Sequence, residues 1–144
     1  MPLSLQNFLA AATIQAAVDL EEALLRLPEE KRSWKSSEQS RSALDQVAEC
    51  AIMNEKVIDM IRIQVFPANY AYIEYQQQIA GLCSDWPALQ NLLHKNAAKV
   101  ADVIRAVSDD DLEAQSDSMN YPYWNMTYHI GQINYIASML GCLD

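Results

Sequence analysis

The sequence predicts an all-α fold: a four-helix bundle with one further short helix, in a single domain that covers residues 1–144. Three observations favour this fold. Apolar residues recur at three- and four-residue spacing over four long stretches. The five prolines stand at the starts of these stretches or between them, and glycine occurs only three times. No two-residue turn of the Asn-Gly kind separates alternating apolar runs, which counts against an all-β fold.

The first two predicted helices cover residues 4–27 and 42–64. Ser4 is a suitable N-cap for the first helix, and Pro28 closes its far end. A polar connection, residues 29–40, separates the two helices. In the second helix, apolar residues occur on more than one side, which predicts contacts with several neighbouring elements.

A short helix is predicted for residues 69–80, which are rich in Tyr and Gln. The next long helix covers residues 86–107, with Ser84 or Asp85 as its N-cap and Pro87 in its first turn. Its leucines and valines form the clearest single stripe in the chain, so one face of this helix is expected in the core.

The last helix covers residues 123–140 and stops at Gly141. No charged residue occurs from 118 to 143, yet the polar side chains of this helix are too numerous for a membrane span. Gly131, inside the helix, costs about 1 kcal/mol relative to alanine and predicts a close backbone approach. Together the apolar stripes predict a core that includes Leu9, Leu20, Leu24, Val47, Ile52, Leu92, Val100, Ile104, Ile133 and Ile136.

A second apolar face of the last helix is aromatic and lies at least a quarter-turn from the face expected in the core. This aromatic face predicts a homodimer, because an acidic monomer is not expected to expose four such residues together. Cover by the short Tyr-rich helix of the same chain is the alternative. The face comprises Trp124, Tyr128, Tyr135 and Met139.

Charge and cysteine content exclude several classes of protein. Ten basic and nineteen acidic side chains give a net charge of −9, so the surface is not suited to bind nucleic acid or an anionic membrane. Cys50, Cys83 and Cys142 are scattered and odd in number, which fits neither a disulfide framework nor a zinc site. Because the N-terminus lacks the basic segment of a signal peptide, the expected location is cytoplasmic.

The two histidines are the first candidates for chemistry. His94 lies off the apolar stripe of its helix and is expected to be an ordinary surface residue. His129 lies on the apolar face of the last helix, with Asn125 one turn earlier, and a core histidine satisfied by hydrogen bonds is favoured there. Glu49, in the second helix, would complete an oxygen and nitrogen ligand set for a divalent metal. Both interpretations of these residues stay open.

Residues 123–133, YWNMTYHIGQI, resemble the last-helix motif of the DinB/YfiT-like family, His-x-x-x-His-x-Gly-Gln-Ile. The segments 27–35 and 41–49 are also similar to that family. The resemblance implies a four-helix bundle, commonly a dimer, with a divalent metal between the second and the last helix. It implies no binding to DNA, in agreement with the acidic charge.

The resemblance places the family's metal ligands at positions that differ in this chain. His129 matches the second histidine of the motif, whereas Asn125 stands at its first histidine and Glu49 at the histidine of the second helix. Characterised relatives include metal-dependent thiol transferases and a mycothiol-dependent isomerase. The first functional hypothesis is therefore a DinB-like transferase or hydrolase, in which a metal at these three residues activates a thiol or water for reaction with a small molecule.

The second functional hypothesis is a non-catalytic dimeric bundle with a vestigial site. Glu49 and Asn125 would then only form hydrogen bonds with His129. Such a bundle would bind a small ligand or a protein in an aromatic cleft, whose expected lining residues are Tyr121, Tyr123, Trp124 and Tyr128.

Overall fold

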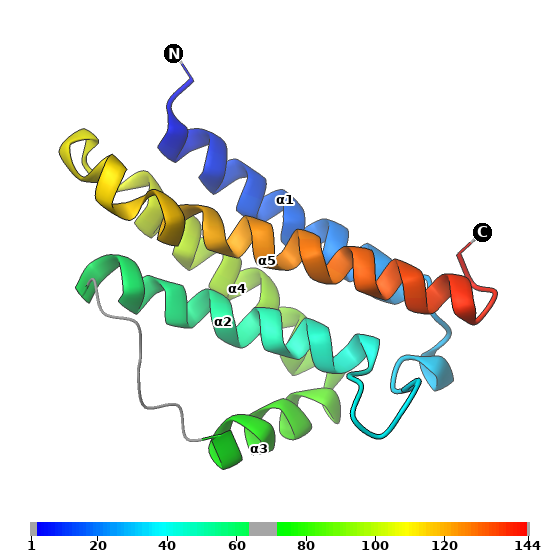
Figure 1. Cartoon of the computed structure of the whole chain (residues 1–144). Coiled ribbons are helices and arrows are strands. Elements are labelled where there is room, and N and C mark those ends of the chain that lie inside the picture. The colour runs from blue at the N-terminus through cyan, green and yellow to red at the C-terminus, as the bar shows by residue number, and fades with distance from the viewer. Residues whose placement is uncertain (1–2, 64–71, 144) are drawn as a thin grey trace.

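A computed structural model describes residues 3–63 and 72–143, and within these ranges the chain contains helices and no strands (Figure 1). The all-α prediction is thus confirmed at the level of a helical bundle. The long helices are α1 (Leu5–Leu25), α2 (Ala43–Ile63), α4 (Trp86–Arg105) and α5 (Leu112–Met139). A shorter helix, α3 (Tyr72–Cys83), packs on α2 and α4. Two 3-10 turns, Glu29–Lys31 and Asp109–Asp111, precede α2 and α5.

The four long helices form a ring in which each packs on two neighbours, in the order α1, α5, α2, α4. The polar contacts give the directions. Gln6 in the first turn of α1 donates to Val107 and Asp109 just before α5, and Arg26 after α1 donates to Asn134 late in α5, so these helices are parallel. Helices α2 and α4 are also parallel to each other and run in the opposite direction (Figure 1).

The predicted helix boundaries for α1, α2 and α4 agree with the structure to within two residues wherever they can be compared. Residue 64 and residues 69–71, which belong to two of the predicted helices, lie outside the described residues. The short helix predicted for 69–80 corresponds to α3, which extends to Cys83.

The core is formed by the predicted stripes with one exception. Nine of the ten named residues are at most 8% exposed, whereas Leu92 is only partly buried at the edge of the larger apolar cluster. The buried stripe of α4 runs through Leu89, Leu93, Val100 and Ile104. Leu92 precedes Leu93 by one residue, or about 100° of helix rotation, which turns it toward the rim. The prediction of a buried Leu92 is therefore wrong in degree.

The start of the last helix was predicted eleven residues too late. Helix α5 begins at Leu112 and passes through Pro122, which the sequence pattern treated as a boundary. A proline inside a helix removes the hydrogen bond to the carbonyl four residues earlier, here that of Ser118. Burial of Gln115, Met119 and Pro122 against the bundle offsets this loss, so tertiary packing determines the helix start.

The end of α5 follows the predicted glycine stop. Gly141 has a φ of 70°, the left-handed conformation that glycine adopts without steric cost. The amide of Gly141 donates to the carbonyl of Ser138, and the amide of Cys142 donates to the carbonyl of Ala137. These two bonds satisfy carbonyl groups that the helix terminus would otherwise leave unpaired.

Gly131 is not approached closely by any backbone among the described residues. Its position is exposed, and a Cβ placed there would meet none of their atoms within 4 Å. The aromatic face around it is also uncovered: Trp124, Tyr128, Tyr135 and Met139 are 46–68% exposed. Among the described residues, no helix combines the length and apolarity needed to cross a membrane.

Candidate functional site

His129 is a buried, neutral histidine between α5 and α2. Its exposed fraction is 2%, and its Nδ1 lies 2.7 Å from Oε1 of Gln46. Because an amide oxygen can only accept, Nδ1 carries the hydrogen and donates it. Burial lowers the pKa of His129 from its ordinary value of 6.5, an effect that the carboxylate of Glu49 opposes and the guanidinium of Arg41 reinforces. His129 is consequently neutral at pH 7.

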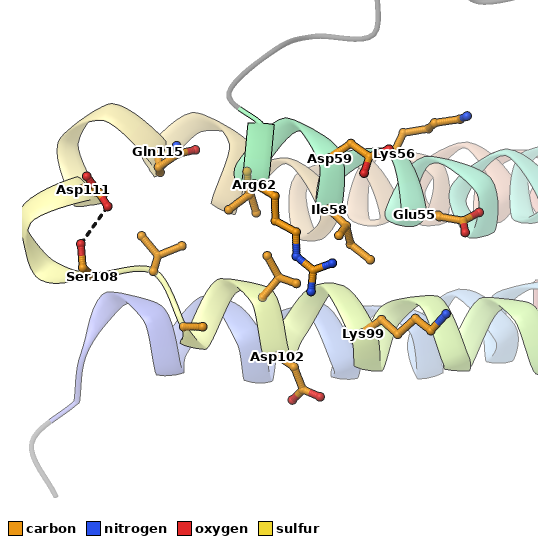
Figure 2. A pocket seen from close by; sticks show the side chains of 14 residues that line it. Glu55, Lys56, Ile58, Asp59, Arg62, Lys99, Asp102, Ser108, Asp111 and Gln115 are labelled. Atoms are coloured by element: carbon orange, nitrogen blue, oxygen red, sulfur yellow. Dashed lines mark hydrogen bonds between the residues drawn. The ribbon is translucent and has the colours of Figure 1, made fainter.

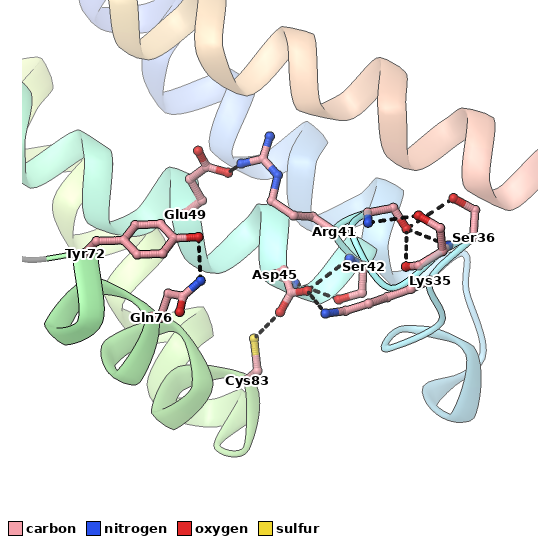
Figure 3. Close-up of polar contacts among 11 residues, drawn as sticks. Lys35, Ser36, Arg41, Ser42, Asp45, Glu49, Tyr72, Gln76 and Cys83 are labelled. Carbon is pink, nitrogen blue, oxygen red and sulfur yellow. Dashed lines mark hydrogen bonds and ion pairs between the residues drawn. The ribbon is translucent and has the colours of Figure 1, made fainter.

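Glu49 lies beside His129 but is paired with a cation. Its carboxylate forms an ion pair with the guanidinium of Arg41, which reaches it from the segment before α2 (Figure 3). The second ring nitrogen of His129, Nε2, is 3.8 Å from Oε2 of Glu49. This separation is too long for a hydrogen bond. The structure thus brings Glu49 and His129 together within a neutral cluster that also contains Arg41 and Gln46.

Asn125 is buried one turn before His129, and its amide is directed elsewhere. Its Nδ2 donates to Sγ of Cys50 over 3.8 Å. One turn further along α2, Nδ2 of Asn54 donates to Sδ of Met126, while Oδ1 of Asn54 is buried without a hydrogen-bond partner among the described residues. Gln46, Cys50 and Asn54, spaced by four residues on α2, thus each contact a side chain of α5.

The three predicted metal ligands do not fit a metal ion as they lie. The carboxylate of Glu49 is already paired with the guanidinium of Arg41. The amide of Asn125 directs its N–H group, and not its oxygen, toward Cys50. Within the described ranges, no three side chains of the His, Cys, Asp and Glu types gather closely enough to hold an ion. The role of Glu49, Asn125 and His129 as metal ligands therefore stays a prediction.

A groove with a volume of about 540 Å³ lies directly above this cluster, between the segment 36–41 and the outer side of α5. Gln46 lines it from below although the residue is only 3% exposed. Arg41 is the one charged residue among the described residues that line the groove. The lining consists of Ser36, Gln39, Ser40, Arg41, Gln46, Tyr128, Gly131, Gln132, Tyr135, Ile136 and Met139.

The predicted aromatic cleft is only partly present. Trp124 stacks on Tyr128, with ring centroids 5.7 Å apart and planes at 18°, and Tyr121 lies 5.9 Å from Trp124 on its other side. Of the four residues predicted to line a cleft, only Tyr128 lines the groove. Tyr123 is turned away and packs against the larger apolar cluster.

A larger hollow, about 950 Å³, lies between α2 and α4 at the other end of the bundle (Figure 2). Its walls carry both charge signs in similar numbers, so it favours neither an anion nor a cation. The charged residues are Glu55, Lys56, Asp59, Arg62, Lys99, Asp102 and Asp111.

His94 lies apart from both hollows. Its Nε2 is 2.6 Å from Oε2 of Glu21 on α1, and its side chain is 38% exposed, in keeping with a surface residue.

Arg41 and Gln46 are the site residues to which the sequence pattern assigned no role. Gln46 had a detectable signal, because it stands four residues before Cys50 and eight before Asn54 on one face of the helix. Arg41 had none, since it precedes α2 and its contact with Glu49 depends on the path of the preceding segment.

Comparison of the chain with protein-family models, with curated proteins and with solved structures gives no match. Membership of the DinB/YfiT-like family is therefore a prediction that rests on the sequence motif alone. The structure adds a helical bundle in which the motif residue His129 on α5 lies beside Glu49 on α2.

Proposed function

We propose that this chain is a non-catalytic helical bundle that binds a small organic molecule in the groove between the segment 36–41 and α5. The observation that carries the proposal is the ion pair of Arg41 with Glu49 at the edge of that groove. It neutralises the carboxylate that a metal site or a general base would need. The hydrogen of His129 Nδ1 is likewise engaged, by Gln46.

The cluster also lacks an activated nucleophile. Burial raises the pKa of the Cys50 thiol well above its ordinary value, so this thiol stays protonated at neutral pH. Cys83 is held in the same state, because burial and the neighbouring carboxylate of Asp45 raise its pKa to about 12. Binding without covalent chemistry is the function that these groups support best.

The groove has the size and composition of a small-molecule site. Ligand pockets typically measure about 300–1,000 Å³ and combine apolar walls with a few convergent polar groups. Here Tyr128, Tyr135 and Met139 supply the apolar surface, while Arg41 and Gln46 supply the polar groups.

A metal-dependent DinB-like enzyme is the competing proposal, and metal analysis separates the two. Elemental analysis by mass spectrometry of protein purified without chelators or an affinity tag is expected to give metal only at background level. The metal-dependent alternative predicts close to one ion per chain, lost in His129→Ala and strongly reduced in Glu49→Gln. Lys35→Gln, which removes the neighbouring cation that pairs with Asp45, is the matched control.

We further propose that two copies associate through the aromatic face of α5. Because the chain carries a net charge of −9, two copies repel each other, and an uncharged surface is the most favourable place for contact. After residue 117, α5 has no Asp, Glu, Lys or Arg side chain and provides such a surface. A partner at this face would also cover the open side of the groove.

The homodimer is expected to dissociate in Tyr135→Glu, because this substitution places a charge on both sides of the shared face. Sedimentation equilibrium at micromolar concentration should give a dimer for the unmodified chain and a monomer for the variant. Tyr72→Glu is the matched control, since Tyr72 is 66% exposed on α3, away from α5. A monomeric unmodified chain would remove the dimer and leave the groove untouched.

A further inference from the structure

We infer that the groove takes an organic carboxylate with a planar ring, its carboxylate held between the Arg41 guanidinium and the Gln46 amide and its ring lying over Gly131. The inference rests on the proposed function and names the class of its ligand. Three independent features of the groove support it: an oriented amide donor, a single cation and a flat apolar floor.

The amide donor is Gln46. Its Oε1 accepts the hydrogen of His129 Nδ1, which fixes the orientation of the amide and leaves Nε2 as the free end. No hydrogen bond from Nε2 to an acceptor occurs among the described residues, and Nε2 is not one of their buried unpaired polar atoms, so it opens into the groove that Gln46 lines. A donor in this position is available to an acceptor from outside the chain. His129 is thus a positioning residue for Gln46.

The cation is Arg41, whose charge contrasts with the acidic character of the chain. The guanidinium has five N–H donors, and its ion pair with Glu49 runs from Nη1. The remaining donors can form charge-assisted hydrogen bonds with a second carboxylate, for which the planar fork is well suited. Arg41 is the one charged residue of the described lining, and no carboxylate of that lining competes with a bound anion for its remaining donors.

The floor is the exposed surface of α5 around Gly131. A glycine inside a helix lowers stability by about 1 kcal/mol relative to alanine, and no packing within the chain requires it. Its missing side chain leaves a flat strip between Tyr128, three residues earlier, and Tyr135, four residues later. Nε2 of Gln132 donates to Oη of Tyr128 over 3.0 Å and so orients one wall. An aromatic ring fits this strip with offset contacts to the tyrosines.

Isothermal titration calorimetry with naphthalene-2-carboxylate and its neutral analogue naphthalene-2-carboxamide tests the inference. We expect the carboxylate to bind roughly tenfold or more tightly than the carboxamide, because it forms charge-assisted bonds with Arg41. Arg41→Gln should remove this preference. Gln46→Glu keeps an acceptor for His129 but replaces the donor with a like charge, so it should abolish binding of the carboxylate and retain that of the carboxamide.

Lys35→Gln is the control, since it deletes a neighbouring cation outside the groove lining and should leave both affinities unchanged. Gly131→Leu fills the floor and should abolish binding of both probes. Equal affinities for the two probes, or a preference that survives in Arg41→Gln, would overturn the carboxylate inference while the proposed binding function stands. Failure of both probes to bind would overturn the inference and the proposed function together.

Discussion

Replacing Ile133 with alanine is expected to lower the free energy of unfolding by about 2–5 kcal/mol. Ile133 is fully buried on α5, in the larger apolar cluster that joins all four long helices. Truncation removes apolar contacts and leaves a cavity that the surrounding helices fill only in part. Urea denaturation measures the effect, and an unchanged slope of the unfolding free energy against urea would show that the unfolded state is comparable.

Leu92→Ala is the matched comparison, because it deletes a leucine of α4 that is only partly buried. Its effect should be clearly smaller than that of Ile133→Ala. A near-neutral Ile133→Ala, or a Leu92→Ala that is equally destabilising, would mean that the helix faces are assigned wrongly.

Gln46→Leu is expected to destabilise the chain by about 1–3 kcal/mol, because it leaves the buried N–H of His129 without an acceptor. The substitution keeps a similar side-chain volume, so the lost hydrogen bond is its main effect. Gln39→Leu changes an exposed glutamine that lines the same groove and should be close to neutral. The comparison is made by thermal or urea unfolding at pH 7. Equal stabilities of the two variants would contradict a structural role for the bond between Gln46 and His129.

The pH dependence of unfolding gives a second readout of the same cluster. The pKa of His129 is lowered in the folded chain, so the unfolded chain binds more protons below the ordinary pKa of 6.5. Stability should therefore be complete above pH 6.5 and fall as the pH decreases from 6.5 toward the lowered value. This loss should shrink in His129→Gln. The lowered pKa of Asp45 acts only below its ordinary value of 3.8, outside this window.

The helices could be predicted from the sequence because their determinants are local. The side chains of Ser4 and Asp85 cap α1 and α4 by accepting a hydrogen bond from the backbone amide three residues later, and Gly141 ends α5. The pattern indicated Ser4 and Gly141, and it offered Asp85 alongside Ser84. The start of α5 could not be predicted, because it depends on packing of residues 112–122 against other helices. That packing overrides the local effect of Pro122.

The candidate site shows the same division. The apolar face of the last helix correctly placed His129 inward, and the family resemblance correctly placed Glu49 near it. Neither source indicated that Arg41 pairs with Glu49, since this contact depends on the path of the segment before α2, or that Gln46 accepts from His129, which depends on the register of α2 against α5. Asn125 shares the flank of His129 yet bonds to Cys50, a choice set by the rotamer rather than by the spacing. Gly131 was expected to mark a close backbone approach, and among the described residues of this chain no backbone makes one.

We propose that the cluster of Arg41, Glu49, Gln46 and His129 is neutral and holds no metal beside a groove that binds a ligand. Nitrogen-15 NMR of the His129 ring at pH 7, recorded before and after addition of equimolar Zn²⁺, tests it most directly. We expect a neutral ring with hydrogen on Nδ1 and none on Nε2, and no change in either resonance when zinc is added. A protonated ring before addition, or a shift of Nε2 that reports zinc coordination, would contradict it.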